Sequence, residues 1–209
     1  MSRFSNYILL IIFLSLGFNS YSQPSPSLGD SYHGGIVFYL DGNGGGLIAA
    51  PSDIGTASWG CLGTNITGAD GSGVGTGLQN TLDIIAAGCT NQYSAAVLCN
   101  NYSLGGYNDW YLPSQMENYY LYTNQNYVGG FSTSNNYWSS TKSNSSNAYY
   151  QNFNTGSIGN GGWRNSNYLV RPIRSFSTNY NFDSSHFVIR ISSDLNNNSG
   201  LNNDQFYLP

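Results

Sequence analysis

Residues able to carry acid–base chemistry are few in this chain of 209 residues, and they are spread along it. Glu117 is the sole glutamate, and His33 and His186 are the two histidines. Hydrolysis of a glycosidic bond usually requires two carboxylates across a cleft, and Asp109 in "YNDW" could pair with Glu117. An Asn-Asp pair before a strand is more typical of a turn, and Glu117 has the spacing of a helix cap.

A nucleophilic triad has equally little support. The sequence contains no G-x-S-x-G elbow, which would hold a catalytic serine between a strand and a helix. His33 precedes a glycine pair at the entrance of a predicted strand, which is more often a structural position than that of a base. Because no titratable residues converge, we predict that the protein is not an enzyme.

The three cysteines predict one disulfide and one buried thiol. Cys61 and Cys89 each lie in a loop with flanking glycine, which favours a bridge between them in an oxidising compartment. Cys99 falls in the helical pattern "YSAAVLCNN", where a thiol behaves as a small hydrophobic group. No C-x-x-C motif occurs, and Asp41 and Asp70 in glycine-rich loops are too few carboxylates for a calcium site. We therefore predict no metal ion and no cofactor.

The N-terminal residues predict export. Arg3 precedes an apolar run of about 12 residues, which is typical of a signal peptide over residues 1–22 with cleavage near Ser22. A bilayer span needs about 20 residues, so the mature protein is expected to lack a membrane span. A Pro/Ser-rich linker follows over residues 23–30. We expect the mature protein to be secreted or to lie at the cell surface.

The composition excludes one class of partner. Charged residues make up 8% of the chain, against about 25% in ordinary soluble proteins. The net charge is −4, and the sequence has no cluster of Lys and Arg, so we predict no binding to nucleic acid. Apolar residues still make up 40% of the chain, which is enough for a buried core.

The periodic patterns predict an α+β domain over residues 31–176, with two to three helices and a small twisted antiparallel sheet. Residues 34–51 read as a hairpin around "DGNGGG", which is not a phosphate-binding loop because no G-K-[ST] follows. Residues 76–88, 91–102 and the segment after Pro113 are predicted helices. In the first helix Leu78, Leu82 and Ile85 recur at helical spacing, and Ser114 and Glu117 predict a capping box for the third.

Short strands are predicted at residues 136–141, 148–154 and 167–176, and Pro172 requires an edge or a bulge in the last of them. The expected core is formed by large apolar side chains. These are Trp110, Leu112, Trp138, Phe153, Val170 and Ile173.

Several of these motifs, in this order, resemble the Lcl C-terminal domain family of bacterial exported domains. They are "GGIVFYL", "LIAAPSD", "WGC", "AAVLCNNYSLGGYNDWYLPSQME", "YWSST" and "YLVRPIRSF". The resemblance covers about residues 29–176 and implies a C-type-lectin-like fold, distantly related to formylglycine-generating enzymes. The late cysteine pair of those enzymes is missing, and so are the E-P-N and Q-P-D loops of calcium-dependent lectins. Residues 177–209 form an Asn-rich tail that we leave unassigned, with a strand-like run at 186–192.

A mixture of Tyr, Asn, Ser and Gly fills residues 135–168, as in antibody paratopes. The resemblance places this segment at one exposed surface. We predict that this surface binds an extracellular glycan or protein. The predicted contact residues are Lys142, Asn144, Tyr150, Gln151, Asn160, Trp163, Arg164, Asn165, Asn167 and Tyr168. Trp163 in "GGWRN" is either a stacking platform for a sugar or protein anchor, or a core plug beneath the loop. Arg171 is expected to bond backbone carbonyls.

Two alternatives stay open. One is a structural or assembly role in a fibre or envelope, with a homo-oligomer as a possible form. The other follows from a similarity of the segment from "YWSST" to "LVRPIR" to the variable region of target proteins of diversity-generating retroelements. A reverse transcriptase gene and a near-copy of codons 135–174 in the neighbouring DNA would favour that alternative.

Overall fold

The computed structural model describes residues 25–89 and 93–178. The predicted signal peptide and the strand-like run 186–192 lie outside these residues. Within them the chain forms four helices and nine strands in two sheets, which confirms the predicted α+β class. The prediction of one small antiparallel sheet with two to three helices is wrong in number, since there are two sheets and four helices. One strand pair, β5 (Asn136–Lys142) with β8 (Tyr168–Leu169), is parallel. No helix among the described residues is long and apolar enough to cross a bilayer.

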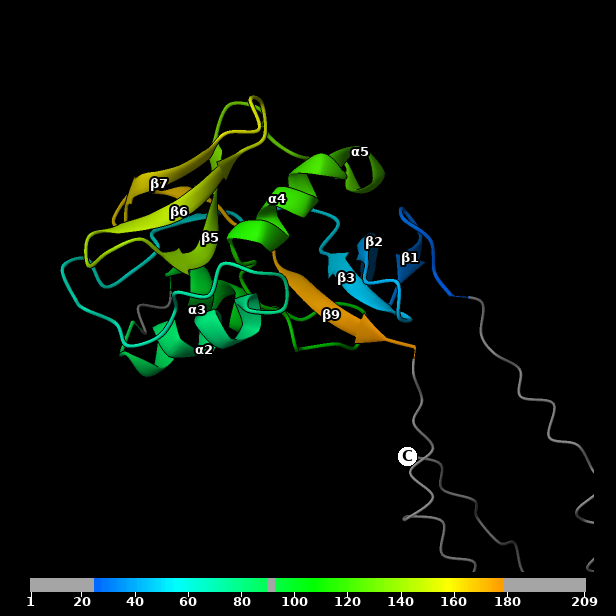
Figure 1. Ribbon diagram of the computed structural model, residues 1–209, viewed down its shortest axis with the longest axis horizontal. Helices are drawn as coiled ribbons and strands as arrows, with labels where there is room; N and C mark the ends of the chain where they lie inside the picture. The colour runs from blue at the N-terminus through cyan, green and yellow to red at the C-terminus, as the bar shows by residue number, and fades with distance from the viewer. Residues whose placement is uncertain (1–24, 90–92, 179–209) are drawn as a thin grey trace, which may run out of the picture. The chain divides into compact units, whose positions relative to one another are not determined.

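The first sheet has the strand order β1-β2-β3-β9 and contains the predicted hairpin. Its strands are β1 (Ser31–Tyr32), β2 (Gly35–Leu40), β3 (Gly45–Ala49) and β9 (Ile173–Ser177). The Asp41 carboxylate closes the hairpin turn, because its Oδ1 accepts the backbone N–H groups of Asn43 at 2.7 Å and Gly45 at 2.9 Å. Strand β9 runs antiparallel to β3, so the end of the domain pairs with its beginning (Figure 1).

The second sheet has the order β4-β8-β5-β6-β7, with β7 at one edge. Its strands are β4 (Thr56–Ala57), β8 (Tyr168–Leu169), β5 (Asn136–Lys142), β6 (Asn147–Asn152) and β7 (Ile158–Trp163). The predicted strand 167–176 is divided between the sheets, because it breaks at 170–172 into β8 and β9. Pro172 lies at this break, where its carbonyl accepts the N–H of Ala50 at 2.9 Å.

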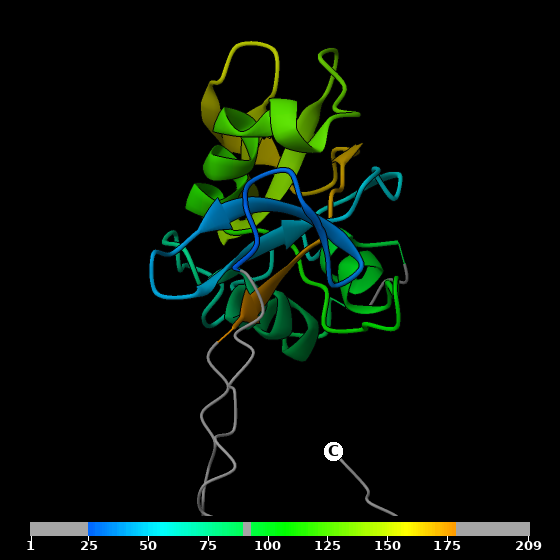
Figure 2. The ribbon, with the colours of Figure 1, turned by 90° about the vertical axis from the view of Figure 1, so that its right-hand side faces the viewer.

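Four helices accompany the sheets, and α4 contacts strands of both (Figures 1 and 2). They are α2 (Gly77–Ala86), α3 (Ala95–Asn100), α4 (Gln115–Thr123) and α5 (Gln125–Val128). The capping box at α4 is confirmed: the Ser114 hydroxyl accepts the N–H of Glu117 at 3.3 Å, and the Glu117 carboxylate accepts the N–H of Ser114 at 2.7 Å.

The buried face of α2 is not the apolar stripe that helical spacing predicts from the sequence. Leu78 and Leu82 are 44% and 43% exposed, whereas Asn80, Thr81 and Ile84 are buried. The two polar residues face inward because they have partners there. Asn80 Nδ2 donates to the carbonyl of Gly71 at 2.6 Å, and the Thr81 hydroxyl accepts the N–H of Leu112 at 3.1 Å.

The predicted core and cysteine pairing are confirmed. All six expected core residues are at most 2% exposed. Cys61 and Cys89 form a disulfide, and Cys99 is a buried free thiol. Buried Trp59 and Trp138 belong to one core cluster, which lies between the second sheet and helices α2 and α3.

Candidate ligand-binding surface

Trp163 is the last residue of edge strand β7 and is 59% exposed, so the core-plug interpretation is wrong. It pairs with Asn147 on β6, while the preceding Gly162 pairs with Ala148. A Cβ atom on Gly162 would lie 2.7 Å from the ring of Trp138, so this side of β7 faces the core. Successive side chains of a strand point to opposite faces. The Trp163 ring therefore points away from Trp138.

Tyr150 and Tyr168 form an aromatic cluster with Trp138 on the core side of the sheet. The ring centroids of Tyr168 and Trp138 are 4.3 Å apart, and those of Tyr150 and Tyr168 are 5.2 Å apart. Both tyrosines are half-buried. Gly159 on β7 makes room for Tyr150, because a Cβ there would lie 2.1 Å from its ring. The cluster is thus fixed by close packing.

Arg164 is buried and is not a surface contact, which corrects the prediction. Its guanidinium donates to the carbonyls of Cys61 at 3.3 Å and Thr64 at 3.1 Å, and also to the carbonyl of Asn144. It lies 4.3 Å from the centre of the Trp59 ring. Burial lowers the pKa of Arg164 to about 10, so the side chain stays charged at neutral pH. The residue fastens the disulfide loop to the turn between β5 and β6.

Gln151 is also buried, which removes a second predicted contact residue from the surface. It follows Tyr150 on β6 and therefore points to the opposite face of the sheet. Its Nε2 donates to the carbonyl of Asn152 at 3.3 Å. The side chain is part of the interior.

Lys142, the last residue of β5, and Asn144, in the following turn, have structural partners. Lys142 Nζ donates to the carbonyl of Ile66 and lies 3.8 Å from the carboxylate of Asp70. The Asn144 side chain is exposed, but its oxygen accepts the N–H groups of Ser146 at 2.8 Å and Asn147 at 2.9 Å, which shapes the turn. Both residues hold loops in place.

The remaining six predicted residues lie on β6, β7, β8 and the turn after β7, and each is exposed or half-buried. We name this set of residues the β7 rim, in which the Tyr150–Tyr168 pair lies on the Trp138 side of the sheet and Trp163 on the other side. It consists of Tyr150, Asn160, Trp163, Asn165, Asn167 and Tyr168. None of these side chains is charged at neutral pH, so the rim offers aromatic rings, amides and hydroxyls.

Arg171, in the break before β9, and Arg174, on β9, also have structural roles. Arg171 donates to the carbonyls of Ala50 at 3.0 Å and Gly130 at 2.8 Å, which confirms the expected backbone bonding, and it pairs with Asp53 at 2.7 Å. Arg174 binds both carboxylate oxygens of Asp109, at 2.7 and 2.8 Å. All four Lys and Arg residues within 25–89 and 93–178 therefore contact a carbonyl or a carboxylate.

The titratable residues considered for catalysis have structural partners as well. The bonds from Arg174 lower the pKa of Asp109. Burial raises the pKa of Glu117, whose carboxylate also accepts the N–H of Gly75 at 2.8 Å. His33 stacks on Tyr32 with ring centroids 3.9 Å apart, and burial followed by the charge of Arg174 lowers its pKa. Among the described residues, no three His, Cys, Asp or Glu side chains gather as a metal site.

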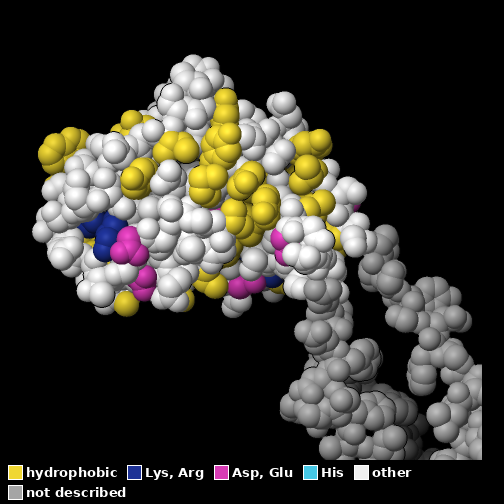
Figure 3. Space-filling view, viewed as in Figure 1, with side chains coloured by type: hydrophobic (Ala, Val, Ile, Leu, Met, Phe, Trp, Pro, Cys, Tyr) yellow, Lys and Arg dark blue, Asp and Glu magenta, His cyan; other side chains and the backbone are white. Residues whose placement is uncertain are grey.

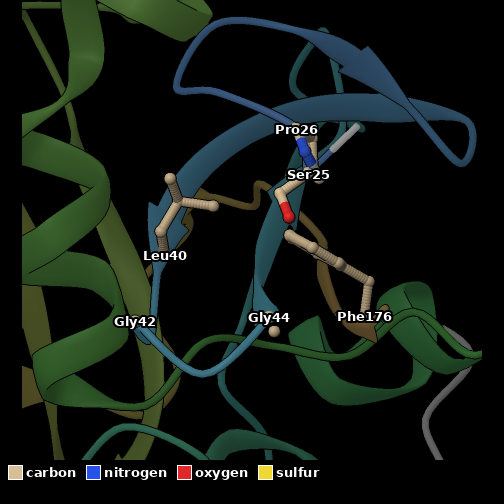
Figure 4. A pocket seen from close by; sticks show the side chains of 7 residues that line it. Ser25, Pro26, Leu40, Gly42, Gly44 and Phe176 are labelled. Carbon is tan, nitrogen blue, oxygen red and sulfur yellow. The ribbon is translucent and has the colours of Figure 1, made fainter. Parts of the chain in front are cut away.

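Three hollows of the described surface lie away from the β7 rim. One of about 190 Å³ is lined by Leu40 and Phe176, which face each other below Ser25 and Pro26 over a glycine turn (Figure 4). Others of about 290 and 340 Å³ lie beside His33 and beside Asn65. The walls of the first are apolar and contain no titratable group. None of the three is lined by a residue of the rim.

An aromatic patch around α4 was missed by the sequence analysis. Hydrophobic side chains gather there, whereas charged side chains are sparse on this face (Figure 3). The rings of Tyr39 and Tyr120 are 4.9 Å apart, those of Tyr119 and Tyr120 are 5.9 Å apart, and the nearby Leu40 is exposed. The signal for it was the run "NYYLY" in the third predicted helix.

Comparison with known proteins gives one family. Residues 71–174 match the family model of the Lcl C-terminal domain, which confirms the resemblance seen in the sequence. No curated protein matches the chain. A crystal structure of a fimbrial protein from Bacteroides ovatus is similar at 17% identity, with a TM-score of 0.48. That similarity covers 72% of this chain and 45% of the fimbrial chain, so the chain spans less than half the length of that protein.

Proposed function

Residues 71–174 belong to the Lcl C-terminal domain family, and we propose that the chain is an exported, non-enzymatic binding module. In this proposal the domain has the C-type-lectin-like fold that the family implies. The module acts at the cell surface or in the extracellular space, where the β7 rim contacts a glycan or a protein. The prediction of a signal peptide over residues 1–22 supports the proposed location.

One observation carries the proposal: Trp163 is 59% exposed on one side of β7, while the Tyr150–Tyr168 pair is packed on buried Trp138 on the other side. Tyrosine and tryptophan supply large contact area with few rotatable bonds, and amides supply adaptable hydrogen bonds. A contact surface needs both properties. Catalysis would need convergent titratable groups, whereas Glu117, Asp109 and His33 have separate structural roles.

The proposal is tested with the purified chain on an array of neutral and anionic glycans and on immobilised extracellular-matrix proteins. A triple variant of exposed rim residues, N160A/W163A/N165A, should lose at least tenfold in affinity for whatever the wild type binds. The matched control is Y127A, which removes an exposed aromatic side chain on α5. Undiminished binding by the rim variant, or equal loss in the control, would refute the assignment of the site.

A role in assembly is the second candidate, because β7 is an edge strand without proline or charge. Such an edge presents unpaired backbone groups to another strand. Light scattering of the purified chain without ligand separates the two functions. A stable oligomer that N160A/W163A/N165A disrupts favours assembly, whereas a monomer that binds a ligand favours recognition.

A further inference from the structure

We propose that Trp163 is a platform for an uncharged sugar ring, so that the ligand of the β7 rim is a neutral glycan. This inference rests on the proposed function and names its ligand class. It draws on the exposure of Trp163, on the rigidity of its backbone and on the charges around it.

Trp163 differs from the other three tryptophans of the chain. Trp59, Trp110 and Trp138 are each at most 1% exposed, and each indole N–H donates to a backbone carbonyl, at 2.8, 3.2 and 2.8 Å. Trp163 has no such bond and no ring partner within residues 25–89 and 93–178. Its indole therefore presents both an aromatic face and an N–H donor to solvent. Indole combines a large apolar area with a polar handle, which suits a ligand of mixed character.

The backbone around this ring is fixed on both sides. Trp163 pairs with Asn147, and its carbonyl accepts the N–H of Ser166 at 2.8 Å. The N–H of Arg164 donates to the carbonyl of Ser146 at 3.0 Å, and the buried Arg164 side chain anchors the following residue. A platform held in this way loses little conformational entropy when a ligand settles on it.

Small and amide residues surround the ring and leave it accessible. A Cβ on Gly161 would meet no atom within 4 Å, so the strand beside the ring is open. Asn147 Nδ2 donates to the carbonyl of Gly161 at 3.0 Å, which orients this amide beside Trp163, and Asn165 is exposed two residues further on. The C–H face of a sugar ring can cover an indole while its hydroxyls bond amide groups.

The charges point to a neutral ligand. Sulfate, phosphate and carboxylate groups are bound by Arg and Lys, preferably with bidentate geometry. The four described cations are occupied by carbonyls and carboxylates, and the whole chain has a net charge of −4. Asp70, beside Lys142 at the end of β5, is 75% exposed. This end of β5 lies across β6 from Gly162 and Trp163, so the charge of Asp70 would repel an anion there. An anionic glycan would therefore meet repulsion, and it would find no unoccupied Lys or Arg among the described residues.

A sugar fits this surface better than a protein does. A stable protein interface buries about 800 Å² on each partner around an apolar centre. Here Trp163 stands among Gly161, Asn147 and Asn165, and the other exposed apolar residue of β7 is Ile158, at its far end. A single ring framed by amides matches one sugar unit.

The test is a titration of the purified chain with neutral oligosaccharides of glucose, galactose, mannose and N-acetylglucosamine, and with sulfated and sialylated oligosaccharides. We expect at least one neutral series to bind by calorimetry and to change the tryptophan fluorescence. The affinity should be nearly equal in 50 and 300 mM salt, because no ion pair is formed. W163A should weaken binding at least tenfold, which equals about 1.4 kcal/mol, and W163F should restore part of it.

Controls separate the inference from the proposed function. W163A should keep the melting temperature of the wild type, since its side chain is exposed, and Y127A should keep both stability and binding. Salt-sensitive binding of sulfated or sialylated sugars, or binding of a matrix protein through the rim, would overturn the neutral-glycan inference and leave the binding module intact. Unchanged sugar binding by W163A would show that the ring of Trp163 is not the platform for the sugar. Failure to bind any glycan or protein would overturn both proposals.

Discussion

The guanidinium of Arg164 lies 4.3 Å from the centre of the Trp59 ring, in the interior of the domain. Its hydrogen bonds reach carbonyls that are 100 and 103 residues earlier in the chain. Arg164 is therefore a structural link, although its neighbour Trp163 is exposed. Arg164 fastens the loops beneath the β7 rim, whereas the side chain of Trp163 faces solvent.

Arg164→Ala should destabilise the fold. The change removes the guanidinium donor from three part-buried carbonyls and opens a space beside Trp59. We expect the free energy of unfolding to fall by about 3 kcal/mol, measured by urea denaturation. Arg164→Lys should lower the free energy of unfolding by a smaller amount, because the ammonium group keeps the charge. It should still destabilise the fold, because it lacks the planar guanidinium with its several N–H donors. Asn165→Ala is the matched control at an exposed position, and a shift of similar size there would contradict the assigned role.

The disulfide should contribute to stability through the unfolded state. Cys61 and Cys89 are 28 residues apart, and closing a loop of that length stabilises a fold by about 3–4 kcal/mol. The C61S/C89S variant should therefore unfold at a lower urea concentration than the wild type under oxidising conditions. Under reducing conditions the difference should nearly vanish. A difference that persists after reduction would show that the two serines, rather than the lost bridge, cause the change.

The parts of the fold that could be predicted depend on local signals. The capping box needs only Ser114 and Glu117, three residues apart, and the hairpin needs only a glycine turn between two apolar runs. The core aromatic residues could be named because Trp138 and Phe153 lie in strand patterns, where large apolar side chains are generally buried.

The errors concern contacts between distant segments. Helical spacing identified Leu78 and Leu82 as one stripe of α2, but the inward face depended on partners for Asn80 and Thr81 in other segments. Arg164 looked like a surface residue because its partners are about 100 residues away. Neither partner set leaves a local pattern. The exposure of Trp163 was equally undecidable until the register of β7 against β6 placed Gly162 toward the core.

Glu117 should make stability depend on pH in a defined direction. Burial raises the pKa of its carboxyl above the ordinary value of 4.5. The folded state therefore holds this proton more tightly than the unfolded state does, and the contribution is fully present below the unfolded pKa. It is lost as the pH rises through the folded pKa. The free energy of unfolding of the wild type, relative to E117Q, should thus decrease from pH 4 toward neutral pH.

The comparison with E117Q removes the other carboxylates from the measurement. Asp109 titrates in the opposite direction, because the bonds from Arg174 lower its pKa, but it is present in both proteins. E117Q also loses one of two acceptors, because the glutamine carbonyl oxygen can accept the N–H of Gly75 or that of Ser114 but not both. A relative stability that increases toward neutral pH would show that the backbone bonds outweigh the cost of burial.

Two consecutive glycines of β7 should respond oppositely to alanine. A Cβ on Gly162 would lie 2.7 Å from Trp138 and 2.9 Å from Tyr150, and the buried Trp138 ring has no room to move. Gly162→Ala should therefore cost about 1–3 kcal/mol by overpacking. A Cβ on Gly161 would meet nothing within 4 Å, so Gly161→Ala should be neutral or stabilise the strand by about 0.5 kcal/mol. Urea denaturation of both variants measures the difference. Equal effects would mean that β7 does not keep the register that turns Gly162 inward and Trp163 outward, and the site assigned to Trp163 would lose its geometric basis.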